Sequence, residues 1–433
     1  MSSAVIDCGY VEQCGWWEIV MTIESDAKIL RELAKRCRDA AASQDRDRTK
    51  DQWRRLHDCR MERPMIWIWV ILFTDELEEI TNLRCEHPLF RQKEQELRVE
   101  LYHHYIGDDY LLEPYLTLQA SRTGLQKGSW GVPFARRTYE GRRPFEGGAA
   151  DVYPDPPIKS LDDLNVIQPV EHGIDEERTA ENRKLLEDAV GDIMPIYVSR
   201  VPVYFREFFA PAVTNMRGMT QLMMDMIENP EGLHRLLGKM QKAVIAAHDR
   251  AEELGDISRA DQYIQSCPYS NYTVDLAPNV PATHKDLWCF VQSQEFTGIS
   301  PQMHKDFALD YQKPIMERFA ASAYGCCEDL THKIDILRDI KNLKQISVTP
   351  AADLEKCAEQ IGSDYVISWR PNPTDHVCAT FDRDRVKRLI AEGRDVLEKY
   401  GCHYEINLKD VLTVQGDRER LREWVQDVRS VIE

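Results

Sequence analysis

The chain has 433 residues, of which 43% are hydrophobic and 30% charged, and its formal net charge is −18. This length is sufficient for one large barrel or two ordinary domains with a substantial buried core. The negative charge argues against a nucleic acid or another polyanion as the principal partner. The longest apolar run, residues 65–73, is too short to cross a bilayer, so no membrane association is expected.

The cysteines and the first residues predict a cytoplasmic protein. Twelve cysteines are scattered along the chain without the compact spacing of a disulfide framework. The amino-terminal stretch contains Asp7, Glu12 and Glu18 instead of the basic start and apolar run of a signal peptide. In a reducing compartment the thiols would be free to bind a metal ion.

Residues 1–62 are predicted to form an amino-terminal helical extension. Within them, residues 24–62 are strongly charged and carry an apolar stripe at helical spacing, formed by Leu30, Leu33, Ala34 and Cys37. A charged segment with one apolar stripe is typical of a cap or of a contact between two copies of a chain. We therefore expect a homodimer.

Residues 63–433 are predicted to form a single TIM (β/α)8 barrel, an α/β fold. The first strand lies in the apolar run 65–73, which is typical of a strand buried on both faces. Further strand signals alternate with helical segments and occur at 109–118, 194–205, 262–267, 287–291, 322–327, 345–348, 365–369 and 402–408. Repeated βα units of this number favour a closed parallel barrel. An open doubly wound sheet is the alternative, but no glycine-rich phosphate-binding sequence follows a strand.

One segment interrupts this alternation. Residues 121–157 are rich in Gly, Pro and Arg and have no clear period. Long irregular segments are uncommon in compact domains unless they are functional or disordered. We predict an irregular insertion near the barrel mouth.

A metal site is predicted where the strands end, because barrel enzymes hold their chemistry at that edge. Cys326, Cys327 and Glu328 end one predicted strand, and Glu405 lies in the last. His304, near the start of a helix, is a further candidate ligand. Thiolates, carboxylates and imidazole are the ligands that zinc prefers, so zinc is the expected metal. The competing interpretation is that the two cysteines are small core residues.

Other side chains at the same edge are predicted to complete a pocket. The candidate catalytic residues are Glu295, Glu405 and Tyr324. A buried carboxyl group with a raised pKa can act as a proton donor. The candidate substrate-binding residues are Trp67, Trp69, Arg370 and Asn372. For the tryptophans, packing in the core is the competing role.

The chain resembles the uroporphyrinogen decarboxylase superfamily. The resemblance lies in Arg63-Pro64-x-x-Trp67 at the first strand, in Ile299-Ser300-Pro301 at a helix start and in the carboxyl-terminal segment. It covers roughly residues 60–433 and implies a TIM barrel. This superfamily contains porphyrinogen decarboxylases and methyltransferases linked to zinc and corrinoid.

The methyltransferase branch, with its methyl-ether demethylases, looks the more similar of the two. The decarboxylases continue from this motif with arginines that hold the substrate's carboxylates, and residues 68–75 contain none. The methyltransferases bind zinc through a His-x-Cys pair and a later Cys. Cys326 matches the Cys of that pair, whereas Tyr324 and Glu405 stand where the other two ligands would be.

The resemblance implies a metal-assisted methyltransferase. It would move a methyl group from a small methyl ether, aromatic ethers included, or a related donor to a corrinoid. A Lewis acid would stabilise the leaving group, and Trp67, Trp69 and Tyr324 would line the donor's pocket. No corrinoid-binding histidine motif is evident, so the corrinoid is expected on a separate carrier protein. The alternative is a decarboxylase-like lyase acting on a small carboxylate without metal, with Glu295 or Glu405 as proton donor.

Overall fold

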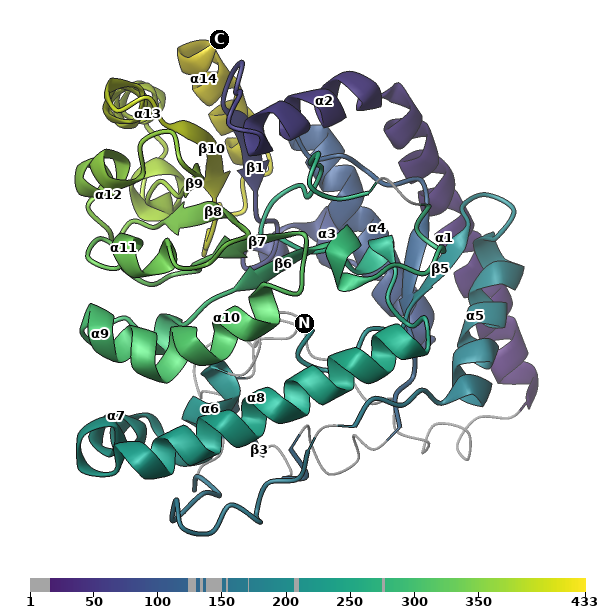
Figure 1. Cartoon of the computed structure of the whole chain (residues 1–433). Helices are drawn as coiled ribbons and strands as arrows, with labels where there is room; N and C mark the ends of the chain where they lie inside the picture. Colours follow the sequence, from purple (N-terminus) through teal and green to yellow (C-terminus); the bar gives the residue numbers. More distant parts are fainter. Residues whose placement is uncertain are drawn as a thin grey trace.

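The computed structural model describes residues 16–123, 130–132, 135–137, 150–152, 155–169, 171–205, 210–274 and 277–433. Figure 1 shows a curled parallel sheet with helices on its outer side. The fold is therefore α/β, as the alternating strand and helix signals predict.

Six parallel strands form the central sheet, in the order β1-β10-β9-β8-β7-β6. They are β1 (Met65–Ile68), β6 (Trp288–Val291), β7 (Ala321–Tyr324), β8 (Leu343–Val348), β9 (Val366–Trp369) and β10 (His403–Leu408). The first strand pairs with the last, with Met65 opposite Glu405 and Trp67 opposite Asn407. This pairing curls the sheet, and the strands near the two ends of the chain lie side by side (Figure 1).

Outside this sheet, β2 (Leu116–Gln119) and β5 (Ile196–Ser199) pair in parallel with each other. In the described ranges no strand pairing joins this pair to the six-stranded sheet. The predicted strand at 262–267 contains only an isolated bridge between Ile264 and Ser266. The structure is thus a half-barrel of six strands with a separate pair, and the closed eight-stranded barrel stays a prediction.

The predicted insertion is described only in part. Its strands β3 (Ala135–Arg137) and β4 (Ala150–Val152) pair antiparallel. Residues 124–129, 133–134, 138–149 and 153–154 lie outside the described residues. The prediction for those positions stays open.

The helices of the described residues lie on the outer side of the sheet, at the amino ends of its strands and beside the β2–β5 pair. They are α1 (Trp16–Ser43), α2 (Arg46–His57), α3 (Glu78–Thr81), α4 (Pro88–Ile106), α5 (Glu176–Val190), α6 (Ala210–Arg217), α7 (Met219–Glu228), α8 (Pro230–Glu253), α9 (Pro301–His304), α10 (Asp310–Met316), α11 (Ile334–Leu337), α12 (Leu354–Ile361), α13 (Arg383–Lys399) and α14 (Arg420–Ile432). No helix in the described part of the chain is long and apolar enough to cross a membrane.

Alternation along the strands gives the sheet an apolar outer face and an inner face that carries polar side chains on β8, β9 and β10. Ile66 and Ile68 of β1 join the large core beneath the outer helices. On β10, Ile406 and Leu408 do the same, whereas Glu405 lies on the other face. Barrel interiors are mostly filled with branched apolar side chains. A buried carboxylate in that layer therefore indicates a functional or specially bonded position.

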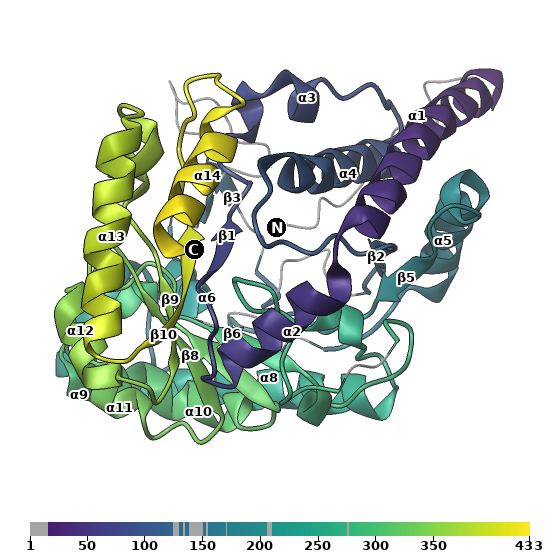
Figure 2. The same cartoon turned by 90° about the horizontal axis from the view of Figure 1, so that it is seen from above.

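The amino-terminal helices pack on the same chain. The predicted stripe on α1 is buried in a cluster with side chains of α4, α5 and β2, and Figure 2 shows these three helices side by side. On α2, Trp53 and Leu56 are buried against Met65 and Val366 at the amino ends of β1 and β9. The chain itself thus covers the stripe from which a dimer contact was expected. The homodimer itself stays a prediction.

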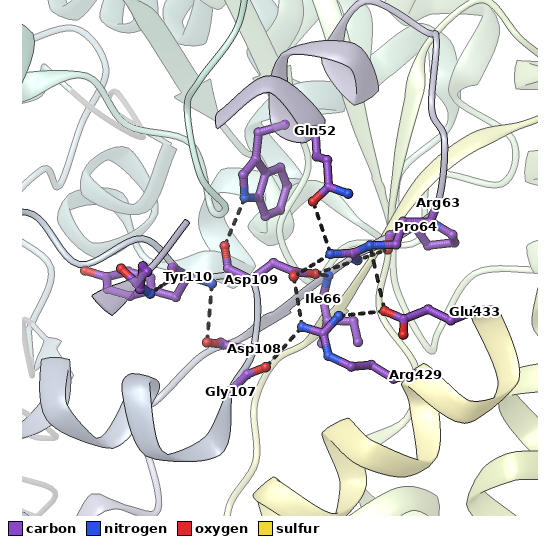
Figure 3. A network of polar contacts seen from close by, with 12 residues as sticks. Gln52, Arg63, Pro64, Ile66, Gly107, Asp108, Asp109, Tyr110, Arg429 and Glu433 are labelled. Atoms are coloured by element: carbon purple, nitrogen blue, oxygen red, sulfur yellow. Dashed lines mark hydrogen bonds and ion pairs between the residues drawn. The ribbon is translucent and has the colours of Figure 1, made fainter. Parts of the chain in front are cut away.

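A polar network around Asp109 joins α2 to β1 and α14. The Asp109 carboxylate accepts hydrogen bonds from Arg63 at 2.8 and 2.9 Å and from Arg429 at 2.9 Å, as Figure 3 shows. It also accepts one from the Ile66 backbone N–H at 2.7 Å, and the Trp53 indole donates to the Asp109 carbonyl at 3.0 Å. Although burial opposes the change, the Arg63 hydrogen bonds and the Arg429 charge lower the pKa of Asp109. Arg63 of the resemblance motif is therefore part of a structural clamp.

Candidate functional site

The carboxyl ends of β7, β9 and β10 bring three reactive side chains together. Cys326 follows β7 by two residues, and Arg370 and Lys409 directly follow β9 and β10. A turn at Gly325, with φ of +100°, carries the chain from β7 to Cys326. A Cβ at this position would lie 2.8 Å from Leu330 Cδ1 and 3.2 Å from Ser347 Cβ. Glycine is thus required both by conformation and by space.

Lys409 lies against both sulfur atoms of the cysteine pair. Its Nζ donates to Cys326 Sγ at 3.0 Å and to Cys327 Sγ at 3.1 Å, and the two sulfurs are 3.6 Å apart. The ammonium also lies 4.6 Å from the ring centroid of Trp69 and 3.6 Å from the Asp410 carboxylate. Lys409 is only 5% exposed, so these contacts fix the charge in place.

Cys326 is surrounded by hydrogen-bond donors and positive charge. Gln265 Nε2 donates to its sulfur at 3.4 Å, and Arg370 donates to its carbonyl oxygen. A hydrogen bond from the Cys327 thiol, together with the charges of Lys409 and Arg370, lowers the pKa of Cys326 although burial opposes the change. The same hydrogen bond and burial raise the pKa of Cys327. The arrangement favours a thiolate at Cys326 and a thiol at Cys327.

Glu328 anchors the backbone near the sulfurs. Its two carboxylate oxygens accept hydrogen bonds from the N–H groups of Ser293 at 2.9 Å and Cys326 at 2.6 Å. The side chain is 1% exposed, and burial raises its pKa. Glu328 therefore ties the loop after β6 to the loop after β7, which sets the position of Cys326.

Glu405 lies deeper, on the inner face of the sheet. Its carboxylate accepts hydrogen bonds from Ser266, from Ser368 at 2.6 Å and from Asn407 at 3.3 Å. The side chain is fully buried, and desolvation raises its pKa above the usual range. A buried carboxyl group with a raised pKa is a candidate proton donor.

Tyr324 and His304 lie on the outer side of the strand. The Tyr324 hydroxyl contacts His304 Nε2 at 2.7 Å, Gln312 Oε1 at 3.1 Å and Ser293 Oγ at 3.2 Å, and the residue joins the outer core. His304 Nδ1 lies 3.2 Å from Lys333 Nζ. Burial and the charge of Lys333 lower the pKa of His304 to about 3. Both side chains thus belong to a network with α9 and α10.

The remaining predicted site residues are placed separately. Trp67 faces inward and contacts Tyr110, with ring centroids 5.2 Å apart, and Trp69 lies beside Lys409. Asn372 is exposed and accepts from the Thr374 N–H at 3.0 Å, as a turn residue does. Glu295 is half-buried in the short turn Gln294–Phe296 after β6.

The five predicted zinc ligands do not form one donor set. Cys326 and Cys327 are adjacent, but Lys409 lies in contact with both sulfurs. The other three side chains have hydrogen-bond partners of their own. Glu328 accepts from two backbone N–H groups, Glu405 accepts from two hydroxyls and an amide, and His304 contacts the Tyr324 hydroxyl. Within the ranges that the structure describes, no group of three His, Cys, Asp or Glu side chains could hold a metal ion.

Sequence reasoning missed Lys409 and Gln265. Alternation on β10 could have found Lys409, because Glu405, Asn407 and Lys409 follow one another at every second residue and so share a face. Gln265 has no such signal, since it comes from a segment without regular strand pairing.

Comparisons with known proteins support the fold but no family. No family model matches the chain, and no curated protein matches its sequence. Among solved structures, 23 chains match. One is described as a methyltransferase from Methanosarcina mazei, with a TM-score of 0.50 and 12% identity over 88% of this chain and 98% of that chain. At this identity the likeness shows a shared fold.

Proposed function

We propose that the chain is a methyltransferase that moves a methyl group from a small methyl ether or related donor to a corrinoid on a separate carrier protein. The fold likeness to the methyltransferase from Methanosarcina mazei supports methyl transfer. The polar cluster at the carboxyl edge of the strands supports an active site there. The observation that carries the proposal is the buried ammonium of Lys409 at that edge, 5% exposed.

The chemistry needs positive charge or a proton at the leaving atom. A methyl ether is a poor electrophile because the oxygen leaves as an anion. Lys409 carries three N–H donors in a water-poor site, where a fixed charge stabilises an anion far better than it does in water. The ring of Trp69 lies against this ammonium, and an aromatic wall of this kind suits an apolar or aromatic donor.

A zinc-assisted reaction is the alternative for the same site. It requires Lys409 to withdraw from the sulfurs so that Cys326 and Cys327 can bind the ion. Zinc bound there would supply the Lewis acid that the family resemblance implies. Chelation before the assay separates the two forms, because only the zinc-assisted reaction loses activity.

The test combines the purified chain with a reduced corrinoid protein and a panel of methyl ethers, aromatic ethers included. We expect demethylated product and a matching change in corrinoid absorbance. The Lys409→Met variant should lose about 100-fold or more in rate, whereas Lys344→Met, which removes a distant lysine beside Tyr272, should not. No transfer from any donor, with or without added zinc, would refute the proposal.

A second candidate function is a metal-free lyase acting on a small carboxylate. Arg370 is 3% exposed and donates to Gln265 and Ser347, and within the described residues no carboxylate forms an ion pair with it. A buried guanidinium of this kind suits a carboxylate ligand. Glu405, with its raised pKa, would supply the proton that replaces carbon dioxide. Release of carbon dioxide from small carboxylates, lost in Glu405→Gln, would favour this function over methyl transfer.

A further inference from the structure

We propose that Lys409 takes the place that a zinc ion would occupy between Cys326 and Cys327, so that the chain carries a fixed organic cation instead of a metal. The inference deepens the proposed function, on which its catalytic meaning rests. Its structural claim concerns the two sulfurs alone and can be tested without any methyl donor.

The distance between the two sulfurs supports the replacement of zinc by the Lys409 ammonium. They lie 3.6 Å apart. Two thiolates bound to one tetrahedral zinc at about 2.3 Å each would be about 3.8 Å apart. The pair is therefore spaced as zinc would require, and Lys409 Nζ, at 3.0 and 3.1 Å from the two atoms, contacts both as the ion would. An ammonium and a divalent ion in one such space would repel each other strongly.

The lysine is held in this position by its surroundings. It follows β10, and the alternation from Glu405 and Asn407 directs its side chain to the inner face. Trp69 lies against the ammonium at 4.6 Å, and Asp410 balances part of its charge at 3.6 Å. The side chain is 4% exposed, so leaving the sulfurs would cost both these contacts and the burial of its stem.

The groups around Cys326 and Cys327 stabilise negative charge on sulfur but offer few further metal ligands. Gln265 donates an N–H to Cys326 Sγ at 3.4 Å. This contact stabilises an anionic sulfur, whereas an N–H group cannot act as a metal ligand. The Asp410 carboxylate, 3.4 Å from Cys327 Sγ, is the oxygen that could join the two thiols if Lys409 were removed. Removing the ammonium should therefore free both sulfurs to bind zinc, with the Asp410 carboxylate beside Cys327.

An ammonium and a zinc ion would stabilise a leaving group in different ways. An ammonium donates hydrogen bonds to a developing anion, whereas zinc binds that anion directly as a Lewis acid. A lysine-based site would also be insensitive to chelators. In the proposed reaction, Lys409 would therefore stabilise the leaving oxygen without any bound metal.

Zinc binding by the full chain tests the inference. Each protein is purified from zinc-supplemented medium, its zinc content is measured by elemental analysis, and its zinc affinity is measured by competition with a chromophoric chelator. The variants are Lys409→Met, Lys409→Gln, Cys326→Ser and the double variant Lys409→Met with Cys326→Ser. Lys344→Met is the matched control, since that lysine also lies over an aromatic ring, 4.2 Å from the centroid of Tyr272.

The parent and the control should bind zinc weakly and below one ion per chain. Both Lys409 variants should bind it at least about 10-fold more tightly, and Cys326→Ser should abolish the gain. One tightly bound zinc in the parent, lost in Cys326→Ser, would overturn the inference. So would unchanged zinc affinity in both Lys409 variants when their circular dichroism matches that of the parent. Failure of methyl transfer would refute the proposed function and leave this result standing.

Discussion

Removal of the Asp109 carboxylate should destabilise the whole chain. Asp109→Ala breaks the ion pairs with Arg63 and Arg429 and leaves the Ile66 N–H without its acceptor. Removing one partner of a buried ion pair typically lowers the free energy of unfolding by about 3–5 kcal/mol. The two arginine side chains are 18% and 26% exposed, so water offsets part of that cost. We expect a loss of about 3 kcal/mol in the free energy of unfolding.

Urea unfolding monitored by circular dichroism measures this loss through the shift of the midpoint. The matched control is Asp192→Ala, which breaks the exposed pair with Arg31 and should leave the midpoint unchanged within error. An Asp109→Ala midpoint equal to that of the control would refute the reasoning. Asp109→Asn should lie between the two, because its amide oxygen still accepts from Ile66 while the charge is gone.

The stability that the Asp109 carboxylate contributes should fall at low pH. The folded pKa of Asp109 lies below its usual value, so folding favours the ionised form. The contribution is fully present above the unfolded pKa of about 3.9 and is lost as the pH falls through the folded pKa. The midpoint difference between parent and Asp109→Ala should therefore be constant from pH 5 upward and shrink below about pH 4. A difference that grows on acidification would contradict this assignment.

Three further substitutions test the packing around the site. Gly393→Ala should cost about 1–3 kcal/mol of stability, measured by urea unfolding, because its Cβ would overlap the Trp369 ring. Tyr324→Phe should cost about 1–3 kcal/mol by leaving buried polar partners unpaired, yet should not change the alkylation rate of Cys326 by iodoacetamide, which mass spectrometry can follow. Gly325→Ala should change that rate, since an added Cβ would strain the turn that positions the sulfur.

The positions of the six strands of the central sheet could be predicted from the sequence because buried parallel strands are short apolar runs between helical segments. The same alternation of strands and helices predicted that Cys326 lies at the carboxyl edge of the sheet. It also placed Glu405 on the inner face, since alternation fixes one face once the other is apolar. Ile406 and Leu408 supply that apolar face on β10.

The side chains that complete the site could not be predicted in the same way. The β7 sequence, Ala-Ser-Ala-Tyr, has no apolar alternation, so nothing in it shows that Tyr324 faces the outer helices. The role of Glu328 depends on two backbone N–H groups, which no side-chain pattern reveals. Gln265 reaches Cys326 from an irregular segment whose path is set by tertiary packing.

The pairing of the first strand with the last has a consequence for synthesis on the ribosome. Met65 of β1 lies opposite Glu405 of β10, about 340 residues later in the chain. At about 5–20 residues per second, β1 waits about 20–70 s for this partner after it is made. During that time an apolar strand edge is open to other nascent chains, which favours aggregation. Added chaperone should therefore raise the yield of folded protein.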